Sequence, residues 1–333
     1  RRRELLRTAM GGVLDVLSIE QIATSLTEIT DATIQAALRA VRREIVTADD
    51  EAFDFAVIGM GRFGGAELGF GSDADILYVY DANGVDPQRA QSLATRIVAG
   101  LREHLTDHRV PLDLDADLRP EGRNGPVVRS IEAYAEYYRR WSLSWEAQAL
   151  LRARGVAGSA TLIAKFTALA DSIRYPAEVD LQGTREIKRI KARVEGERLP
   201  QGVDPRRHLK LGPGTLSDVE WLVQLLQLQH AHDVPALQTT STLTALGAAV
   251  DAGFVPADAA DLLRAAWLLS SRLRSAITLY TGKTSDVLPT DPRDLDAIGR
   301  LLGYPDRSAS VLDDDYLGVT RRARRAFEQL FYG

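Results

Sequence analysis

Two aspartates, Asp73 and Asp75, are the residues of this chain whose type and spacing most directly suggest chemistry. They stand at the start of an apolar run, Ile76 to Tyr80, which predicts a β-strand. Side chains of a strand alternate between its two faces, so carboxylates two residues apart point in the same direction. Adjacent carboxylate oxygens are the ligands that hard cations such as Mg²⁺ prefer. The pair therefore indicates a site for a divalent metal.

The stretch before these acids is rich in glycine and follows another predicted strand, Phe53 to Ile58. One interpretation is a nucleotidyltransferase loop whose backbone N–H groups contact a triphosphate. Gly59 to Gly64 also spells GxGxxG, with Asp81 placed as the ribose-binding acid of a dinucleotide fold. Further glycines interrupt the helix that a dinucleotide fold needs, so we favour the triphosphate; a glycine-rich hairpin with solvated acids is the third alternative. The predicted nucleotide contacts of this loop are Gly61, Gly64, Gly65, Gly71 and Ser72.

A third carboxylate is expected from a neighbouring strand, because two acids are rarely enough for metal-dependent phosphoryl chemistry. The segment Val110 to Leu118 alternates acids with apolar residues and predicts such a strand. Its acids Asp113, Asp115 and Asp117 share one face, and their spacing cannot choose among them.

The composition limits the class of protein. The chain has 333 residues, of which 45% are hydrophobic, and this is enough for two or three domains with sizeable cores. A net charge of −5 argues against a general nucleic-acid binder, and no apolar run approaches the roughly 18 residues that cross a bilayer. There is no cysteine, which fits a reducing compartment. We expect a cytoplasmic protein with neither nucleic acid nor membrane as a partner.

The periodicity predicts an α+β fold in three parts. Residues 1–50 form leading amphipathic helices, and residues 51–150 form a nucleotidyltransferase domain. This domain has a small mixed sheet, a helix between Pro87 and His108, and helices against one face. After Asn124-Gly125-Pro126 the pattern is helical to the end, so residues 151–333 form an all-helical domain. We expect the active site in the cleft between the last two domains.

Four blocks of the chain together resemble the glutamine synthetase adenylyltransferases. They are GRFGGAELGFGSDADILY, LDADLRPEGRNGPVV, WEAQALLRARGVAG and GPGTLSDVEWLVQLLQLQHA, in matching order and spacing along most of the chain. The resemblance implies that Asp73, Asp75 and Asp115 bind metal and are the catalytic acids. There are two departures: Arg62-Phe63 stands where the family often has Lys-Leu, and Asp117 stands where it often has Arg.

The resemblance also implies further contacts with the nucleotide. Arg152 and Arg154 would lie two apart on a helix and diverge, and the block containing them should lie near the site. Asp117, Asp218 and Glu220 are possible second contacts to the metal or its ligands, although acids in the first turn of a helix ordinarily just complement its dipole. The additional nucleotide-binding residues that we predict are Arg119, Arg154 and Lys210.

The function implied is transfer of AMP from ATP to a tyrosine hydroxyl of glutamine synthetase, with two Mg²⁺ or Mn²⁺ ions, to regulate nitrogen assimilation. A nitrogen-signalling regulatory protein would act on the full-length enzyme. The segments ELGFGSD and SDVEW are more similar to the family's AMP-adding halves than to its AMP-removing halves. The first residue, Arg1, suggests a piece cut from a longer polypeptide, and the end at Gly333 suggests its C-terminal half. The alternatives are the half that removes AMP by phosphorolysis, or a non-catalytic module that binds glutamine synthetase.

Overall fold

The computed structural model describes residues 1–141, 144–179 and 181–333. Its helices and one small mixed sheet confirm the predicted α+β class. By its contacts the chain divides into two compact units, and the domain boundaries at residues 50 and 150 stay predictions. The first unit comprises Arg1–Thr8, Ala23–Leu68 and Ser72–Arg174, and the second comprises Ala9–Ile22, Gly69–Gly71 and Tyr175–Gly333.

The two strands around the glycine-rich stretch form the centre of the sheet. β1 (Asp54–Gly59) and β2 (Ala74–Asp81) are antiparallel, and their register runs from Asp54 opposite Asp81 to Gly59 opposite Ile76. A dinucleotide fold needs parallel strands joined through a full helix. Here the connection holds only α3 (Gly61–Gly64), a single turn. The topology therefore agrees with our preference against the dinucleotide interpretation.

Three short strands complete the sheet, in the order β3-β2-β1-β5, with β4 also paired to β2. β3 (Leu114–Asp115) and β4 (Val128–Ser130) run parallel to β2, whereas β5 (Arg154–Gly158) runs antiparallel to β1. The prediction of continuous helix after residue 126 was wrong for β4 and β5. β5 reads RGVAG, and its glycines and alanine carry little strand propensity.

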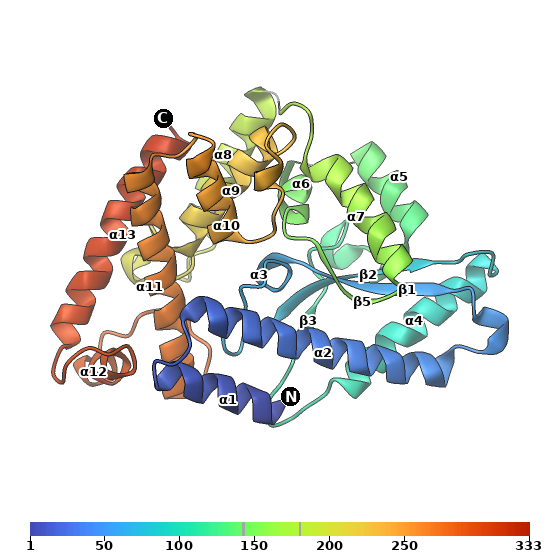
Figure 1. The fold of residues 1–333 in the computed structure, drawn as a ribbon, viewed down its shortest axis with the longest axis horizontal. Coiled ribbons are helices and arrows are strands. Elements are labelled where there is room, and N and C mark those ends of the chain that lie inside the picture. The colour runs from blue at the N-terminus through green and yellow to red at the C-terminus, as the bar shows by residue number, and fades with distance from the viewer. Residues whose placement is uncertain (142–143, 180) are drawn as a thin grey trace. The chain divides into compact units, whose positions relative to one another are not determined.

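Helices cover both faces of the sheet, so the prediction of helices on one face was wrong (Figure 1). The physical reason is that Phe55 and Ala56, which point to opposite faces of β1, are both fully buried. α5 and α7 pack with the face that contains Ala56, where Tyr134 and Phe166 join the core. α4 contacts β2 and β4. The helices of this unit are α2 (Ile19–Ile45, from Ala23 onward), α3, α4 (Pro87–His104), α5 (Ile131–Trp141), α6 (Ser144–Leu150) and α7 (Ala160–Arg174).

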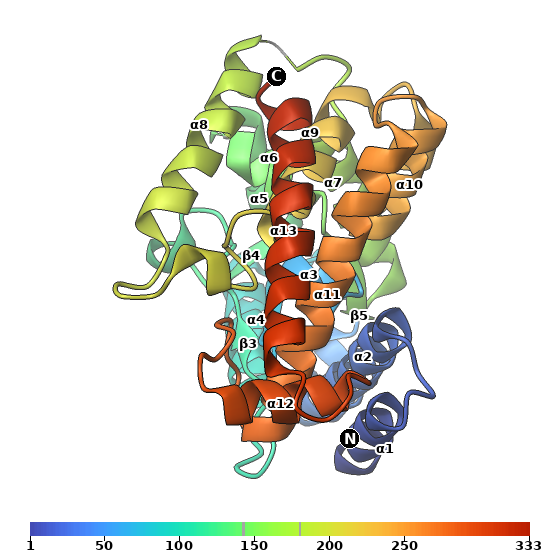
Figure 2. The same cartoon turned by 90° about the vertical axis from the view of Figure 1, so that its left-hand side faces the viewer.

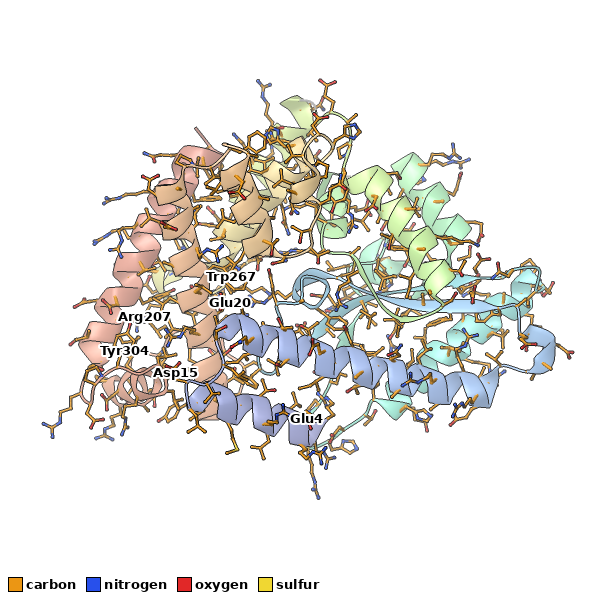
Figure 3. The ribbon with its side chains drawn as sticks, in the orientation of Figure 1. Glu4, Asp15, Glu20, Arg207, Trp267 and Tyr304 are labelled. Atoms are coloured by element: carbon orange, nitrogen blue, oxygen red, sulfur yellow. The ribbon has the colours of Figure 1, made fainter. Side chains whose placement is uncertain are left out.

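The second unit is helical in its described part except for an isolated bridge between His208 and Val287. α13 runs alongside α11 (Figure 2). Leu273, Leu312 and Tyr316 belong to the buried core that these and neighbouring helices share. Arg207, which is labelled in Figure 3, ends the short 3-10 helix Pro205–Arg207. It connects that helix to α13 by an ion pair with Asp313, with 2.6 Å between nitrogen and oxygen. Its helices are α8 (Leu181–Glu197), α9 (Leu216–His230), α10 (Thr242–Asp251), α11 (Ala257–Thr281), α12 (Pro292–Leu301) and α13 (Ala309–Phe331), and α1 (Arg2–Val13) belongs to it from Ala9.

Among the described residues, every helix is too short or too polar to cross a bilayer.

Candidate active site

The three acids that the sequence singled out lie together at one end of the sheet. Ligand oxygens of Asp73, Asp75 and Asp115 all fall within 4.8 Å of one another. The pairing of β2 with β3 explains this, because Asp75 and Asp115 are direct partners in the parallel register. Asp73 lies one residue before β2 and is exposed, and the other two are half-buried. The register thus places Asp115, one of the three alternatives that spacing left open, beside Asp75, and its role as a metal ligand stays a prediction.

Gly61 shapes the space around Asp75. Its backbone has φ +50°, and a Cβ atom there would stand 2.2 Å from Oδ2 of Asp75. The N–H of Met60 donates to the carbonyl of Asp75 at 2.8 Å, which extends the β1–β2 ladder to the turn. Only a residue without a side chain lets the backbone approach the carboxylate this closely. Gly61 is therefore required by the metal-ligand candidate itself, whatever it does for a nucleotide.

The acids on either side of Asp115 have other surroundings. Asp113 is exposed, and its backbone carbonyl accepts the N–H of Ala74 at 2.9 Å. The carboxylate of Asp117 accepts from Arg123 at 2.5 Å, while its backbone N–H donates to Oδ1 of Asp115 at 2.7 Å. Asp117 therefore orients Asp115 through its backbone while its own charge is paired.

Arg119 is buried, and its guanidinium serves the loop in which it lies. It donates to the carbonyl oxygens of Gly125 at 3.0 Å, Ala116 at 2.8 Å and Arg123 at 3.2 Å. Because the Arg119 guanidinium donates to three backbone carbonyls of the loop after β3, it fixes that loop and holds the segment containing Asp115 in place. Its predicted contact with a nucleotide remains a prediction.

The single-turn α3 is held from outside by the segment that leads into β5. A Cβ atom at Gly64 would stand 1.8 Å from the carbonyl oxygen of Arg152, so the two backbones are in direct contact. The guanidinium of Arg152 forms a buried ion pair with Glu67 at 2.9 Å. Arg154 pairs instead with Asp31 of α2, at 2.8 and 3.0 Å. The two arginines diverge as expected, but the helix predicted for them was wrong: Arg152 lies in a turn and Arg154 begins β5.

Gly65, Gly71 and Ser72 complete the predicted loop contacts. Gly65 ends α3 with φ −73°, a conformation open to any residue, so its backbone does not require glycine. Gly71 has φ +68° and belongs to the second unit, where a Cβ atom would meet Thr284 at 2.5 Å. Ser72 is half-buried. Their contact with a nucleotide stays a prediction.

The remaining predicted residues belong to the second unit. Lys210 is exposed, and Glu220 is half-buried on α9. Asp218 is fully buried, with Lys191 at 2.7 Å, Arg324 at 3.0 Å and the N–H of Gly214 at 2.6 Å. This carboxylate is surrounded by positive and donor groups that already neutralise it.

The donor set of the first unit fits a divalent cation. Three carboxylates on one edge of a sheet repel one another, and nearby cations would relieve that repulsion. Within the described part of the chain, no basic side chain forms an ion pair with Asp73 or Asp115, in contrast to Asp117 with Arg123. Oxygen ligands alone, with no sulfur and no histidine in this cluster of described residues, favour Mg²⁺ or Mn²⁺ over zinc.

Two acids of this region, Asp31 and Glu67, escape prediction from the sequence, although they pair with the two arginines of the RAR segment. Neither lies in a pattern that indicates chemistry: Asp31 is a polar residue on a long amphipathic helix. Only the fold shows that it reaches residues far along the chain.

A mixed sheet, a glycine turn next to it, and three clustered acids on its adjacent strands together define a nucleotidyltransferase-like α+β domain. The family model described as glutamate-ammonia ligase adenylyltransferase matches residues 1–169, slightly more than half of the chain. The chain belongs to this family. A second family model, described as GlnD PII-uridylyltransferase, matches residues 186–331.

Three relatives that match along nearly the whole chain share the name bifunctional glutamine synthetase adenylyltransferase/adenylyl-removing enzyme. The protein from Leifsonia xyli subsp. xyli is 57% identical over 333 residues, which are 100% of this chain and 33% of the relative. The protein from Mycobacterium avium is 50% identical over 99% of this chain and 34% of its own length. That from Streptomyces coelicolor is 47% identical over 100% of this chain and 35% of its own. The chain thus spans about a third of the length of these relatives.

Proposed function

We propose that this chain transfers AMP from ATP to a tyrosine hydroxyl of glutamine synthetase. The observation that carries the proposal is the cluster of Asp73, Asp75 and Asp115, with ligand oxygens within 4.8 Å of one another. A module that only binds a partner has no physical reason to gather three like charges on one sheet edge. Family membership and the name of the relatives support glutamine synthetase as the protein acted on.

In the proposed reaction the tyrosine oxygen attacks the α-phosphorus of ATP. The bond from that phosphorus to the oxygen bridging to the β-phosphate breaks, and pyrophosphate leaves. The tyrosine proton must be removed, because a phenol with a pKa of about 10 is a poor nucleophile at neutral pH. We assign that role to Asp115, whose Oδ1 accepts the N–H of Asp117 at 2.7 Å and is thereby fixed in orientation.

The residues that would hold divalent metal are Asp73, Asp75 and Asp115. Bound Mg²⁺ or Mn²⁺ supplies positive charge for the triphosphate and the oxygens that gain charge during transfer. Gly61 lets the α3 turn approach Asp75, and this keeps the backbone N–H groups of the turn close to where phosphates would bind. Arg119 and Arg154 remain proposed contacts with the nucleotide. We propose that they also hold the loops that carry the site, since both donate to backbone carbonyl oxygens and Arg154 also donates to Asp31.

The wider assignment rests on sequence similarity. We propose the adding direction because ELGFGSD and SDVEW are similar to the AMP-adding halves of the family. We further propose a cytoplasmic enzyme that helps to regulate nitrogen assimilation, with a nitrogen-signalling protein acting on the longer polypeptide. The contacts of Gly64, Gly65, Gly71, Ser72 and Lys210 with ATP, and of Asp117, Asp218 and Glu220 with the site, are part of the same proposal.

The test is the mass of glutamine synthetase after incubation with this chain, ATP and Mg²⁺. We expect a gain of one AMP per subunit, and no gain with Asp75→Asn or Asp115→Asn. Asp113→Asn is the matched control, because it removes an exposed carboxylate from the same segment without touching the cluster. No gain with the wild-type chain, together with phosphate-dependent loss of AMP from modified glutamine synthetase, would reverse the direction. Full transfer by Asp75→Asn would refute the assignment of the metal site.

A further inference from the structure

The α3 turn cannot hold its conformation alone. It contains four residues, and an isolated helix of one turn is unstable because nucleation costs more than one hydrogen bond returns. Yet its first residue, Gly61, must stay against Oδ2 of Asp75. Contacts from other elements must therefore fix the turn, and the structure shows where they come from.

Arg154 provides three of these contacts. Its Nε donates to the carbonyl of Gly64 at 3.2 Å, and one terminal nitrogen donates to the carbonyl of Phe63 at 3.3 Å. The guanidinium carbon also lies 5.6 Å from the centre of the Phe63 ring. One side chain thus binds the carbonyl end of the turn and one face of its aromatic residue. The Phe63 carbonyl also accepts the N–H of Ala66 at 3.2 Å, so Arg154 adds side-chain hydrogen bonds to the backbone ones that close this end of the turn.

Asp31 determines where that guanidinium lies. Both of its oxygens accept from the terminal nitrogens of Arg154, at 2.8 and 3.0 Å, which is the two-point geometry that fixes the guanidinium plane. The side chains of Arg154 and Asp31 are 29% and 27% exposed, so the pair is partly shielded from solvent. Asp31 belongs to α2, well before the blocks that carry the chemistry.

From this chain of contacts we infer that Asp31 and Arg154 are positioning residues for the metal site. The pair fixes the α3 turn, the turn places Gly61 against Asp75, and α2 therefore contributes to metal and ATP binding without touching either. This inference rests on the proposed function for its link to ATP. The link to the acid cluster rests on the contacts alone.

A second arginine–aspartate pair in the same unit serves as a matched control. Arg2 and Asp107 also form a two-point pair, in which Nε and one terminal nitrogen of Arg2 each donate to an oxygen of Asp107 at 2.8 Å; the Asp107 side chain is 18% exposed and that of Arg2 53%. In the described ranges, neither residue forms a hydrogen bond or ion pair with α3 or with the three acids. A purely structural role for Asp31 predicts that Asp31→Asn and Asp107→Asn differ only in how much they lower the unfolding temperature.

The experiment compares Asp31→Asn, Arg154→Lys and Asp107→Asn with the wild-type chain. Mn²⁺ affinity is measured without ATP by electron paramagnetic resonance, and hydrogen exchange is measured by mass spectrometry for the peptide spanning residues 59–67. The KM for ATP and kcat are measured in the transfer assay. For the first two variants we expect Mn²⁺ affinity to fall about tenfold, the lower end of the loss seen when partners that orient metal ligands are removed. We also expect faster exchange in residues 59–67 and a higher KM, with Asp107→Asn unchanged in all three.

The outcomes separate this inference from the proposed function. If wild type binds Mn²⁺ but transfers no AMP, the proposed function fails, and the inference still stands or falls on Mn²⁺ affinity and exchange. If Asp31→Asn and Arg154→Lys both keep Mn²⁺ affinity and exchange within about twofold of wild type, the pair is structural only and the inference is overturned. If wild type binds no Mn²⁺, both are overturned.

Discussion

Gly61→Ala is the substitution whose effect follows most directly from the geometry of the site. The new Cβ atom would stand 2.2 Å from Oδ2 of Asp75, far inside any ordinary contact. To relieve the clash, either the carboxylate or the α3 turn must retreat by roughly 1 Å, and a misplacement of that size can cost on the order of 10²-fold in rate. The backbone adds a second cost, because φ +50° is strained by about 1–2 kcal/mol for a residue with a side chain.

The two costs can be measured separately. Mn²⁺ affinity and AMP transfer report the displacement of Asp75, whereas the urea midpoint of unfolding reports the backbone strain. Gly84→Ala is the matched control: Gly84 lies in the same unit with φ +91°, and a Cβ atom there would meet no described atom within 4 Å. It should lose stability while retaining metal affinity and transfer.

A Gly61→Ala chain that binds Mn²⁺ and transfers AMP as wild type does would contradict this expectation. In that case Asp75 would tolerate a shifted position, or would not bind metal. A loss of transfer of the same size in Gly84→Ala would also contradict it, because strain alone would then explain the effect.

Two further predictions concern the second unit. Lys191→Met should lower the free energy of unfolding by about 3 kcal/mol, because it removes the ammonium group 2.7 Å from the fully buried carboxylate of Asp218 and leaves that charge less compensated. The urea midpoint of unfolding should fall accordingly, and an unchanged midpoint would contradict the prediction. Burial lowers the pKa of His208 below its usual 6.5, and its Nδ1 accepts two backbone N–H groups, so the folded state favours the neutral ring. As the pH falls below about 6.5, the unfolded chain binds the proton first, so the wild-type chain should lose stability that the His208→Asn chain retains. Urea midpoints of both chains between about pH 7 and pH 5 measure this difference. Equal pH dependence in the two chains would show that His208 is not responsible.

Local periodicity was sufficient to predict the acids but not the choice among them, and only the family resemblance pointed to Asp115. The predicted strand placed Asp113, Asp115 and Asp117 on one face, and nothing in the local pattern distinguishes them. The choice depends on the register between β2 and a strand of only two residues, β3. Register is set by pairing with a distant part of the chain, so local periodicity does not contain it.

The strands that the sequence missed are those with the weakest local signal. β5 contains two glycines, and Gly158 has φ +111° with its backbone against the carbonyl of Phe55, where a Cβ atom would stand at 2.1 Å. The missing side chain of Gly158 lets the backbone fit closely against β1, and the same missing side chain weakens the strand pattern in the sequence. Tertiary contact with β1, including a register shift between Val57 and Ile58, overrides the low intrinsic propensity.

Arginine roles show a different limit of sequence analysis. The RAR segment was expected near the site from the resemblance, and in the structure its arginines do contact the glycine-rich segment. What spacing could not give is the direction of a long side chain, which depends on where its acidic partner lies: Glu67 for Arg152 and Asp31 for Arg154. The role of a glycine likewise depends on a distant contact. Gly64 is required because a Cβ atom there would stand 1.8 Å from the carbonyl oxygen of Arg152. A glycine-rich motif that suggests phosphate binding can thus owe its glycines to packing against the chain's own backbone, and only the contacts separate the two causes.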